Sequence, residues 1–259
     1  LNVALVQLNT VWEEKRKNFG KVEALVSDAM QLGNIDVLAL PEMFATGFVV
    51  DESASELAED ESGETCSFLK ELANQYNMYV IGTYIEKHQP RPRNTAIVFD
   101  RQGEKIAEYH KIHLFSSAGE DKYYEAGTED NIANFSLNGI KTSLAICYDL
   151  RFPELFRKAV KKYATELFFV VSNWPSVRQK HWDTLLKARA IENQAYVCAV
   201  NRVGKDPKNS YDGGTTIIDP KGEGQAAYNE EIILTKKVDI KELEVWRRAF
   251  KVLKDTKLL

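Results

Sequence analysis

Three side chains that together could perform nucleophilic chemistry lie at the ends of strand-like stretches of this sequence or between them. Cys147 ends "SLAIC" just before "YDLRFPE", Glu42 follows "LALP", and Lys111 lies within "EYHKIHLF". A nucleophilic cysteine needs a base and a means of stabilising its thiolate. A carboxylate can accept the thiol proton and deliver it to a leaving amine, and an ammonium group can stabilise a thiolate or an oxyanion. Each residue alone also fits an ordinary structural role, so the hypothesis depends on the set.

The position of Cys147 favours a catalytic role. An apolar strand that breaks at once into a turn and a helix places the cysteine at the carboxyl end of the strand, where layered α/β proteins bind ligands. The backbone N–H of Tyr148 can then face a developing oxyanion. Cys66, on a predicted helix face, and Cys198, in the centre of a predicted strand, are interpreted as buried structural thiols.

The four histidines offer competing interpretations. "HKIH" spaces His110 and His113 three residues apart, but no cysteine or carboxylate cluster completes a metal site. His181, in "RQKHWDTLL", could instead be the base of a Cys–His peptidase, and this alternative stays open. We expect neither a metal nor an organic cofactor.

The elements that must position these residues alternate between short apolar runs and longer amphipathic stretches. The helical spacing of apolar residues predicts helices over 13–32, 64–77, 153–163, 178–194 and 240–252. Short apolar runs predict strands over 3–8, 35–42, 78–86, 95–100, 142–149, 166–174, 195–203, 214–222 and 231–239, with another strand and a turn within 100–115. The stretch 43–63 is predicted to be a loop.

Many of these strands are almost continuously apolar, which is typical of a sheet buried on both faces. The alternation of strands and helices predicts one α/β domain over residues 1–259, built from layers of sheet and helix. Because more than about nine strands is a large number for one open twisted sheet, we expect two stacked sheets with helices outside them.

Composition excludes several classes of function. The net charge of −4 predicts binding neither to nucleic acid nor to an anionic membrane. No apolar run approaches the roughly 18 residues that a membrane-spanning helix needs, and "LNVALVQLN" is interpreted as a strand and not as a signal peptide. Three scattered cysteines without CxxC spacing predict no disulfide framework and favour a cytoplasmic protein.

Taken together, "LPEMF", "KIHLF" and "CYDLRFPE" resemble the motifs of the nitrilase superfamily of carbon–nitrogen hydrolases, and the resemblance extends from "VALVQLN" to "GGTTIIDPKG". It implies an α-β-β-α sandwich and a homodimer. It also implies that Glu42 is the general base, Lys111 the oxyanion-stabilising lysine and Cys147 the nucleophile. The family has a second glutamate between the lysine and the cysteine, for which Glu120 is the best match and Glu125 the competitor.

The motif "CYDLRFPE" together with "SNWP…R…HW…LLKARAIENQ" is most similar to the omega-amidase branch, whose members hydrolyse the terminal amide of 2-oxoglutaramate and 2-oxosuccinamate. The Cys-Trp-Glu of nitrile hydrolases and the asparagine that follows the cysteine in many carbamoyl-amine hydrolases are absent. Amidases of deaminated glutathione have closely similar motifs and stay an alternative. A scaffold protein that kept the fold and lost the chemistry is a further alternative.

A substrate with carboxylate and keto groups would need a cation in its pocket. Arg178, near the start of a predicted helix, is the candidate, because an arginine fork and helix N-terminal N–H groups both suit a carboxylate. A solvated position on the helix surface stays open for this arginine. Arg151 and Glu154 are expected to brace the turn after the cysteine. The other residues predicted to contact the substrate are Tyr148, Trp174, Phe44 and Phe115.

Overall fold

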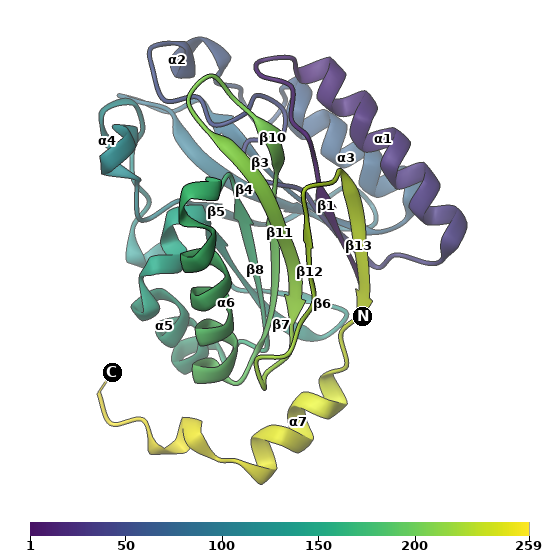
Figure 1. Ribbon diagram of the computed structural model, residues 1–259, viewed down its shortest axis with the longest axis vertical. Coiled ribbons are helices and arrows are strands. Elements are labelled where there is room, and N and C mark those ends of the chain that lie inside the picture. Colours follow the sequence, from purple (N-terminus) through teal and green to yellow (C-terminus); the bar gives the residue numbers. More distant parts are fainter. Residues whose placement is uncertain (259) are drawn as a thin grey trace.

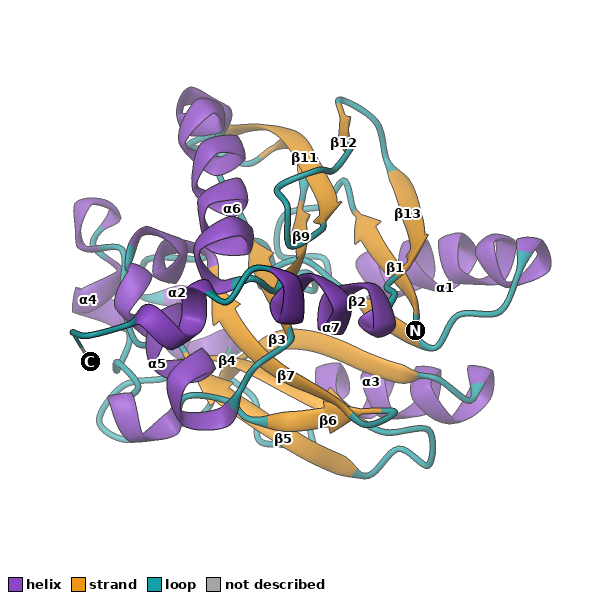
Figure 2. Ribbon diagram, turned by 90° about the horizontal axis from the view of Figure 1, so that it is seen from below, coloured by secondary structure: helices purple, strands orange, loops and turns teal. Residues whose placement is uncertain are grey.

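Two β-sheets pack face to face in the computed structural model, which describes residues 1–258, and helices cover their outer sides (Figures 1 and 2). The first sheet has the spatial order β13 (Ile232–Lys237), β1 (Asn2–Gln7), β2 (Val37–Ala39), β3 (Tyr79–Glu86), β4 (Arg93–Phe99), β5 (Lys105–His110). The second has the order β10 (Val203–Lys205), β11 (Ser210–Ile218), β9 (Tyr196–Asn201), β8 (Leu167–Ser172), β7 (Ile140–Ile146), β6 (Phe135–Leu137), and β12 (Ala226–Tyr228) pairs with β11. Strands β1 to β3 are mutually parallel, as are β7 to β9, and the other neighbours are antiparallel.

The longer helices form the outer layers of this sandwich. Helices α1 (Lys15–Leu32) and α3 (Glu64–Tyr76) lie on one side, and α5 (Pro153–Tyr163) and α6 (Gln179–Asn193) lie on the other (Figure 1). Two short helices, α2 (Ser53–Leu57) and α4 (Glu120–Tyr123), belong to loops, and α7 (Ile240–Ala249) follows the last strand. The 3₁₀ turns are η1 (Ser116–Ala118), η2 (Glu129–Asn131), η3 (Cys147–Arg151), η4 (Ser176–Arg178) and η5 (Val252–Asp255). The predicted α-β-β-α order of layers is therefore observed.

The alternation of side chains along each strand explains why both faces of the first sheet are apolar. In β1, Val3 and Leu5 point into the core between the sheets, whereas Ala4 and Val6 point into a second core beneath α1 and α3. Successive side chains of a strand face opposite sides of its sheet. A strand buried on both faces therefore needs an apolar residue at almost every position, as the sequence shows.

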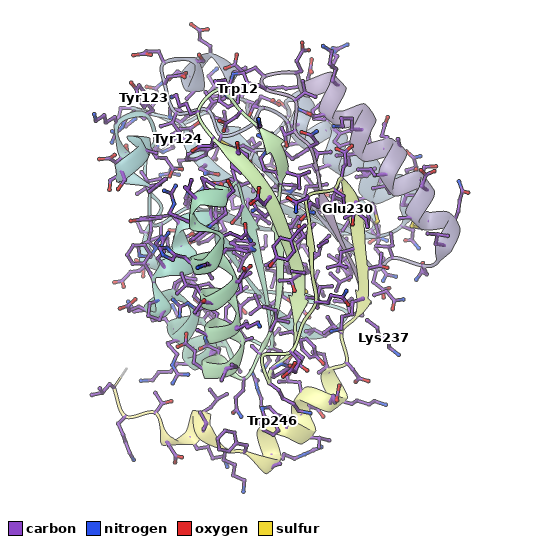
Figure 3. All side chains as sticks on the ribbon, in the orientation of Figure 1. Trp12, Tyr123, Tyr124, Glu230, Lys237 and Trp246 are labelled. Atoms are coloured by element: carbon purple, nitrogen blue, oxygen red, sulfur yellow. The ribbon has the colours of Figure 1, made fainter. Side chains whose placement is uncertain are left out.

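The apolar stripes of the helices meet the sheets as predicted. Val22 and Val26 of α1 are fully buried, as are Trp182 and Leu186 of α6. Burial of one such side chain contributes about 1.5–3 kcal/mol, so these faces hold the helices in their layers. Helix α7, which carries Trp246, lies across the end of the sandwich (Figure 3). The Lys221 Nζ atom lies 5.6 Å from the centroid of the Trp246 ring.

The structure differs from the sequence prediction mainly in short elements. The stretch 43–63, predicted as a loop, contains α2, and the strands β6, β10 and β12 were not predicted. Each of these strands has three residues, which is too few for an alternating pattern to be recognised. Among residues 1–258, no helix combines the length and the apolar character needed to cross a membrane.

Candidate active site

Several strand ends from both sheets meet at one edge of the sandwich. Glu42 lies three residues after β2, Lys111 directly follows β5, Cys147 directly follows β7 and Asn173 directly follows β8. Asn94 lies near the start of β4, which runs antiparallel to β5 and therefore begins where β5 ends. All five residues are buried. The packing of the two sheets thus brings together residues that are far apart in the chain.

Lys111 forms ion pairs with two carboxylates in the interior. Its Nζ lies 2.9 Å from Glu42 Oε1 and 2.8 Å from Glu120 Oε2, and all three side chains have 0% exposure. Burial alone would lower the pKa of Lys111, but the charges of Glu120 and Glu42 outweigh that effect and raise the pKa above its ordinary value. Lys111 is therefore an ammonium group over the whole working pH range of a protein.

Glu120, and not Glu125, lies beside this lysine. The Oε2 atom of Glu120 also accepts a hydrogen bond of 2.6 Å from the backbone N–H of Phe115. Burial raises the pKa of Glu120, against the opposing charge of Lys111. Glu125 instead forms a half-exposed ion pair of 3.2 Å with Arg91. Of the two glutamates considered from the sequence, only Glu120 has the geometry to act with Lys111.

Two asparagines that the sequence analysis missed hold the glutamates. Asn94 Nδ2 donates to Glu42 Oε1 at 2.8 Å and to Glu120 Oε1 at 3.1 Å. The backbone N–H of Asn173 donates to Glu42 Oε2 at 2.8 Å, and its Nδ2 donates to the Glu42 carbonyl at 2.6 Å. An amide side chain at a strand end carries no sequence signal of its own, so only the tertiary structure reveals these contacts.

Cys147 begins the turn η3 in a strained conformation. Its φ of 48° lies in the left-handed region, which costs about 1–3 kcal/mol for a residue with a side chain. The thiol lies 3.8 Å from the Asn173 carbonyl oxygen. Burial raises the pKa of the Cys147 thiol, and the charge of Glu42 and its hydrogen bond raise it further, against the effect of Lys111. The resting thiol is therefore protonated and needs a base.

The other two cysteines lie away from this edge. Cys66 and Cys198 are buried and unpaired. Burial raises the pKa of Cys66 to about 12, and burial likewise raises the pKa of Cys198. Cys66 belongs to the core beneath α1 and α3, and Cys198 to the core between the sheets. Their surroundings agree with the structural role predicted for both.

A buried carboxylate ties the lysine segment to the cysteine turn. Asp149 Oδ1 accepts hydrogen bonds from the backbone N–H of His113 at 2.9 Å and from His113 Nδ1 at 2.7 Å. Asp149 Oδ2 accepts from the Tyr109 hydroxyl at 2.7 Å and from the Ile146 N–H at 3.0 Å. Tyr109 and His113 flank Lys111 in the sequence, and Ile146 precedes Cys147. The three bonds from Tyr109 and His113 fix one segment relative to the other across the two sheets, and the bond from Ile146 closes the turn around Cys147.

The histidines considered from the sequence have other partners. His110 Nδ1 lies 3.0 Å from Thr95 Oγ1, so the two histidines of "HKIH" contact different residues and do not converge. His181 is exposed, and its Nδ1 lies 3.3 Å from an Arg151 guanidinium nitrogen. His181 does not line the cavity at Cys147, so the geometry gives no support to a Cys–His pair.

A cavity of about 310 Å³ opens above Cys147. Aromatic side chains form part of its wall, and they are Phe48, Phe115, Tyr148 and Trp174. Within residues 1–258, the charged side chains that line it are Arg151, Arg178 and Lys208, all of them cations. A cavity with this lining favours a small anionic ligand with an apolar or planar part.

One residue predicted to contact the substrate lies elsewhere. Phe44 packs in the core against Phe19 and Phe68, with ring centroids 6.0 and 6.1 Å away, so its predicted role in the pocket is wrong. The chain turns sharply after Glu42, where Met43 has a φ of 43°, and this turn sends Phe44 to the far side of the first sheet. Phe48 lines the cavity instead.

Arg151 also differs from its predicted role. In place of an ion pair with Glu154, its guanidinium lies 4.6 Å from the Trp174 ring centroid and lines the cavity. Arg178 lies 5.1 Å from the Phe115 ring centroid on the same cavity. Burial lowers the pKa of Arg151, and the charge of Arg178 lowers it further. Two arginines that repel each other across a cavity would be stabilised by an anion between them.

The sequence matches the carbon-nitrogen hydrolase family over residues 2–248. This chain belongs to that family. The predicted resemblance to carbon–nitrogen hydrolases is thereby confirmed, and the protein is an enzyme of this class. In this carbon–nitrogen hydrolase, the buried Glu42–Lys111–Glu120 cluster lies beside Cys147, and the cavity there has a cationic lining.

Individual relatives span nearly the whole of this carbon–nitrogen hydrolase. The 2-oxoglutaramate amidase of Bacillus subtilis (strain 168) is 36% identical over 255 residues, which are 98% of this chain and 96% of that protein. Omega-amidase YafV of Yersinia enterocolitica is 34% identical over 259 residues, 99% of this chain and 96% of that protein.

A solved structure supports the same assignment. The crystal structure of XC1258 from Xanthomonas campestris, described as a CN-hydrolase superfamily protein with an arsenic adduct in its active site, superposes with a TM-score of 0.92. It is 31% identical, and the match covers 100% of this chain and 98% of that chain. The predicted fold class is therefore confirmed.

Proposed function

We propose that this carbon–nitrogen hydrolase removes ammonia from the terminal amide of small 2-oxo dicarboxylic acid monoamides, such as 2-oxoglutaramate and 2-oxosuccinamate. The observation that carries the proposal is the buried cluster of Glu42, Lys111 and Glu120 beside the Cys147 thiol, beneath a cavity whose charged lining is entirely cationic within residues 1–258. The two relatives described above bear the names 2-oxoglutaramate amidase and omega-amidase, which agrees with this substrate class.

The first half of the proposed reaction forms a thioester. Glu42 accepts the Cys147 proton as the sulfur attacks the amide carbonyl, because the raised pKa of the thiol prevents it from ionising unaided. Lys111 and the backbone N–H of Tyr148 stabilise the oxyanion that develops. The carbon–nitrogen bond then breaks, and Glu42 returns the proton to the nitrogen, which leaves as ammonia.

The second half releases the acid. A water molecule takes the place of ammonia, gives a proton to Glu42 and attacks the thioester carbonyl. The carbon–sulfur bond breaks, the carboxylic acid product forms, and the sulfur recovers its proton from Glu42. Glu120 holds Lys111 in place through both of its oxygens, 2.9 and 2.8 Å from Nζ.

In this proposal the cations of the cavity bind the distal carboxylate of the substrate. The guanidinium carbons of Arg151 and Arg178 lie 4.6 and 5.1 Å from the ring centroids of Trp174 and Phe115, and these contacts hold both groups at the cavity wall. A planar fork can donate two parallel hydrogen bonds to a carboxylate. The aromatic walls would then contact the planar 2-oxo group, while the terminal amide reaches Cys147 at the base of the cavity.

An ammonia-release assay on a panel of amides tests the proposal. The panel contains 2-oxoglutaramate, 2-oxosuccinamate, deaminated glutathione, glutamine, a simple nitrile and an N-carbamoyl amine. We expect the two 2-oxo monoamides to give the highest kcat/KM. Preference for deaminated glutathione, for the nitrile or for the carbamoyl compound would overturn the proposed substrate class. An absence of ammonia from every compound would favour a protein that kept the fold without the chemistry.

Arg178→Met and Arg151→Met should each weaken the binding of a substrate carboxylate. A hydrogen bond to a charged group contributes about 1.5–3 kcal/mol, so kcat/KM for 2-oxoglutaramate should fall by about 10–100-fold, mainly through KM. Steady-state kinetics measure the effect, with Arg91→Met as a control outside the cavity. If a neutral amide without a carboxylate suffered the same loss, these arginines would not be carboxylate ligands.

We also propose that the protein is a cytoplasmic homodimer. Its three cysteines are unpaired and buried, as suits a reducing compartment. Ile191 on α6 and Phe250 after α7 are large apolar side chains with 52% and 51% exposure, and a partner subunit would cover such positions. Light scattering after size-exclusion chromatography should give twice the mass of the chain, and a monomer at micromolar concentration would contradict the dimer.

A further inference from the structure

Asn94 contacts the catalytic groups without reaching the substrate cavity. Its Nδ2 donates to Glu42 Oε1 and Glu120 Oε1, and its backbone oxygen accepts a 2.9 Å hydrogen bond from the Lys111 N–H. The side chain is fully buried and is not part of the cavity lining. One residue thus touches three of the four proposed catalytic residues.

The charges of the cluster explain why such a donor is needed. Two carboxylates share a single ammonium, so the fully ionised set carries a net charge of −1 in the interior. An uncompensated buried charge is costly unless neutral donors stabilise it. Asn94 Nδ2 bridges the same pair of carboxylate oxygens, Glu42 Oε1 and Glu120 Oε1, that Lys111 contacts.

The chemistry also fixes the orientation of this amide. The reversed orientation would place the Asn94 carbonyl oxygen against two carboxylate oxygens, and none of the three atoms could donate a hydrogen bond. In the observed orientation Oδ1 is buried without a hydrogen-bond partner within residues 1–258. Asn94 leaves one polar atom unsatisfied so that its amide protons can reach both glutamates, which indicates that the donation to the carboxylates is the dominant contact.

We propose that Asn94 is a positioning residue that keeps Glu42 ionised and aimed at Cys147, so that Glu42 can accept the thiol proton. The inference rests on the proposed function, because it deepens the role of the general base. The charged and titratable groups that face the Glu42–Glu120 pair are Lys111, Cys147 and Tyr124. Tyr124 comes from the end of α4 (Figure 3) and donates its hydroxyl to the Val49 carbonyl at 2.7 Å.

The decisive variant is Asn94→Asp, which keeps the shape of the side chain and replaces the donor by a third carboxyl group. A like charge beside Glu42 disfavours its ionised form. The acid limb of the pH profile, both of kcat/KM and of the rate of Cys147 alkylation, should therefore move to higher pH by about one pH unit. Turnover at pH 7 should fall by about 10–100-fold, the same range as when a hydrogen-bond partner that orients a metal ligand is lost.

Two measurements separate this proposal from the proposed function. The first is the pH profile of kcat/KM for 2-oxoglutaramate. The second is the pH profile of Cys147 alkylation by iodoacetamide, followed by peptide mass spectrometry, which needs proton acceptance by Glu42 but no amide turnover. If the wild-type protein releases no ammonia, the proposed substrate fails, yet the alkylation profiles of the Asn94 variants still test the positioning role.

A second variant and a control complete the experiment. Asn94→Ala adds no charge, and it should lower the alkylation rate and move its acid limb in the same direction by a smaller amount. Asn193→Asp, at another fully buried asparagine, should leave the acid limb in place. Two results for Asn94→Asp would overturn the proposal. One is a lower alkylation rate with an unmoved acid limb, which would make Asn94 a structural residue, and the other is the same rate and acid limb as the wild-type protein. If Asn94→Asp does not fold, the same two results in Asn94→Ala decide.

Discussion

The Cys147→Ala variant is expected to fold like the wild-type protein and to release ammonia from 2-oxoglutaramate at least about 10⁴-fold more slowly, the scale of loss when an enzyme's nucleophile is removed. Without the sulfur no thioester can form, and Glu42 has no thiol proton to accept. The substitution keeps the Cβ atom of a residue at φ 48°, so it neither adds nor relieves backbone strain. Single-turnover kinetics and circular dichroism measure the two expectations.

The other cysteines provide matched controls for this variant. Cys66→Ala and Cys198→Ala each remove a buried thiol outside the cavity, so they should cost stability but leave kcat within a factor of a few. Electrospray mass spectrometry during turnover should show the acyl adduct on Cys147. An adduct on Cys66 or Cys198, or normal turnover by Cys147→Ala, would show that the sulfur of Cys147 is not the nucleophile.

The sequence predicted the strand ends of the candidate site where their signals are local. Cys147 lies where an apolar run stops, Lys111 lies between two strand-like halves of 100–115, and both directly follow a strand in the structure. The carboxyl ends of strands are where layered folds place their ligands. Glu42 follows a strand of the first sheet and Cys147 follows a strand of the second. No local pattern specifies how two sheets stack, so only the family motifs could predict that these two residues meet.

The residues that the sequence analysis missed act through tertiary contacts. Asn94 is significant only because β4 and β5 pair so that its carbonyl accepts the Lys111 N–H. Phe44 was assigned to the cavity because it lies two residues after Glu42, but the φ of 43° at Met43 reverses the direction of the chain between them. A backbone turn of one residue decides which face a side chain occupies. The residue that turns is a methionine and not a glycine, and the nearest glycine, Gly47, lies four residues later.

Lys111→Met should damage both activity and stability, for one electrostatic reason. Loss of an oxyanion donor costs on the order of 10²–10³ in kcat. Loss of the ammonium also leaves Glu42 and Glu120 buried without a cation, and removing one partner of a buried ion pair costs about 3–5 kcal/mol of unfolding free energy. Methionine nearly matches the length of the lysine side chain, so little of this loss would come from a cavity. Urea denaturation and steady-state kinetics measure both effects.

The pH dependence of that instability distinguishes charge from packing. Without Lys111, burial and mutual repulsion raise the folded-state pKa of the two carboxyls above their unfolded values. A carboxyl group whose pKa is higher in the folded than in the unfolded state contributes fully to the free energy of unfolding below its unfolded pKa. That contribution is lost as the pH rises through the folded pKa. The stability deficit of Lys111→Met should therefore be greatest near pH 8 and shrink steadily toward pH 5.

Lys105→Met is the matched control, because Lys105 forms partly exposed ion pairs with Glu61 at 2.5 Å and Glu108 at 2.9 Å. Exposed pairs contribute about 0–1 kcal/mol, so this variant should lose little stability and keep its activity. A deficit in Lys111→Met that stayed constant between pH 5 and pH 8 would mean that packing, and not charge, makes the lysine necessary. The ion pairs of Lys111 with Glu42 and Glu120 would then not be what makes the lysine necessary for stability, and the electrostatic argument for this cluster would fail.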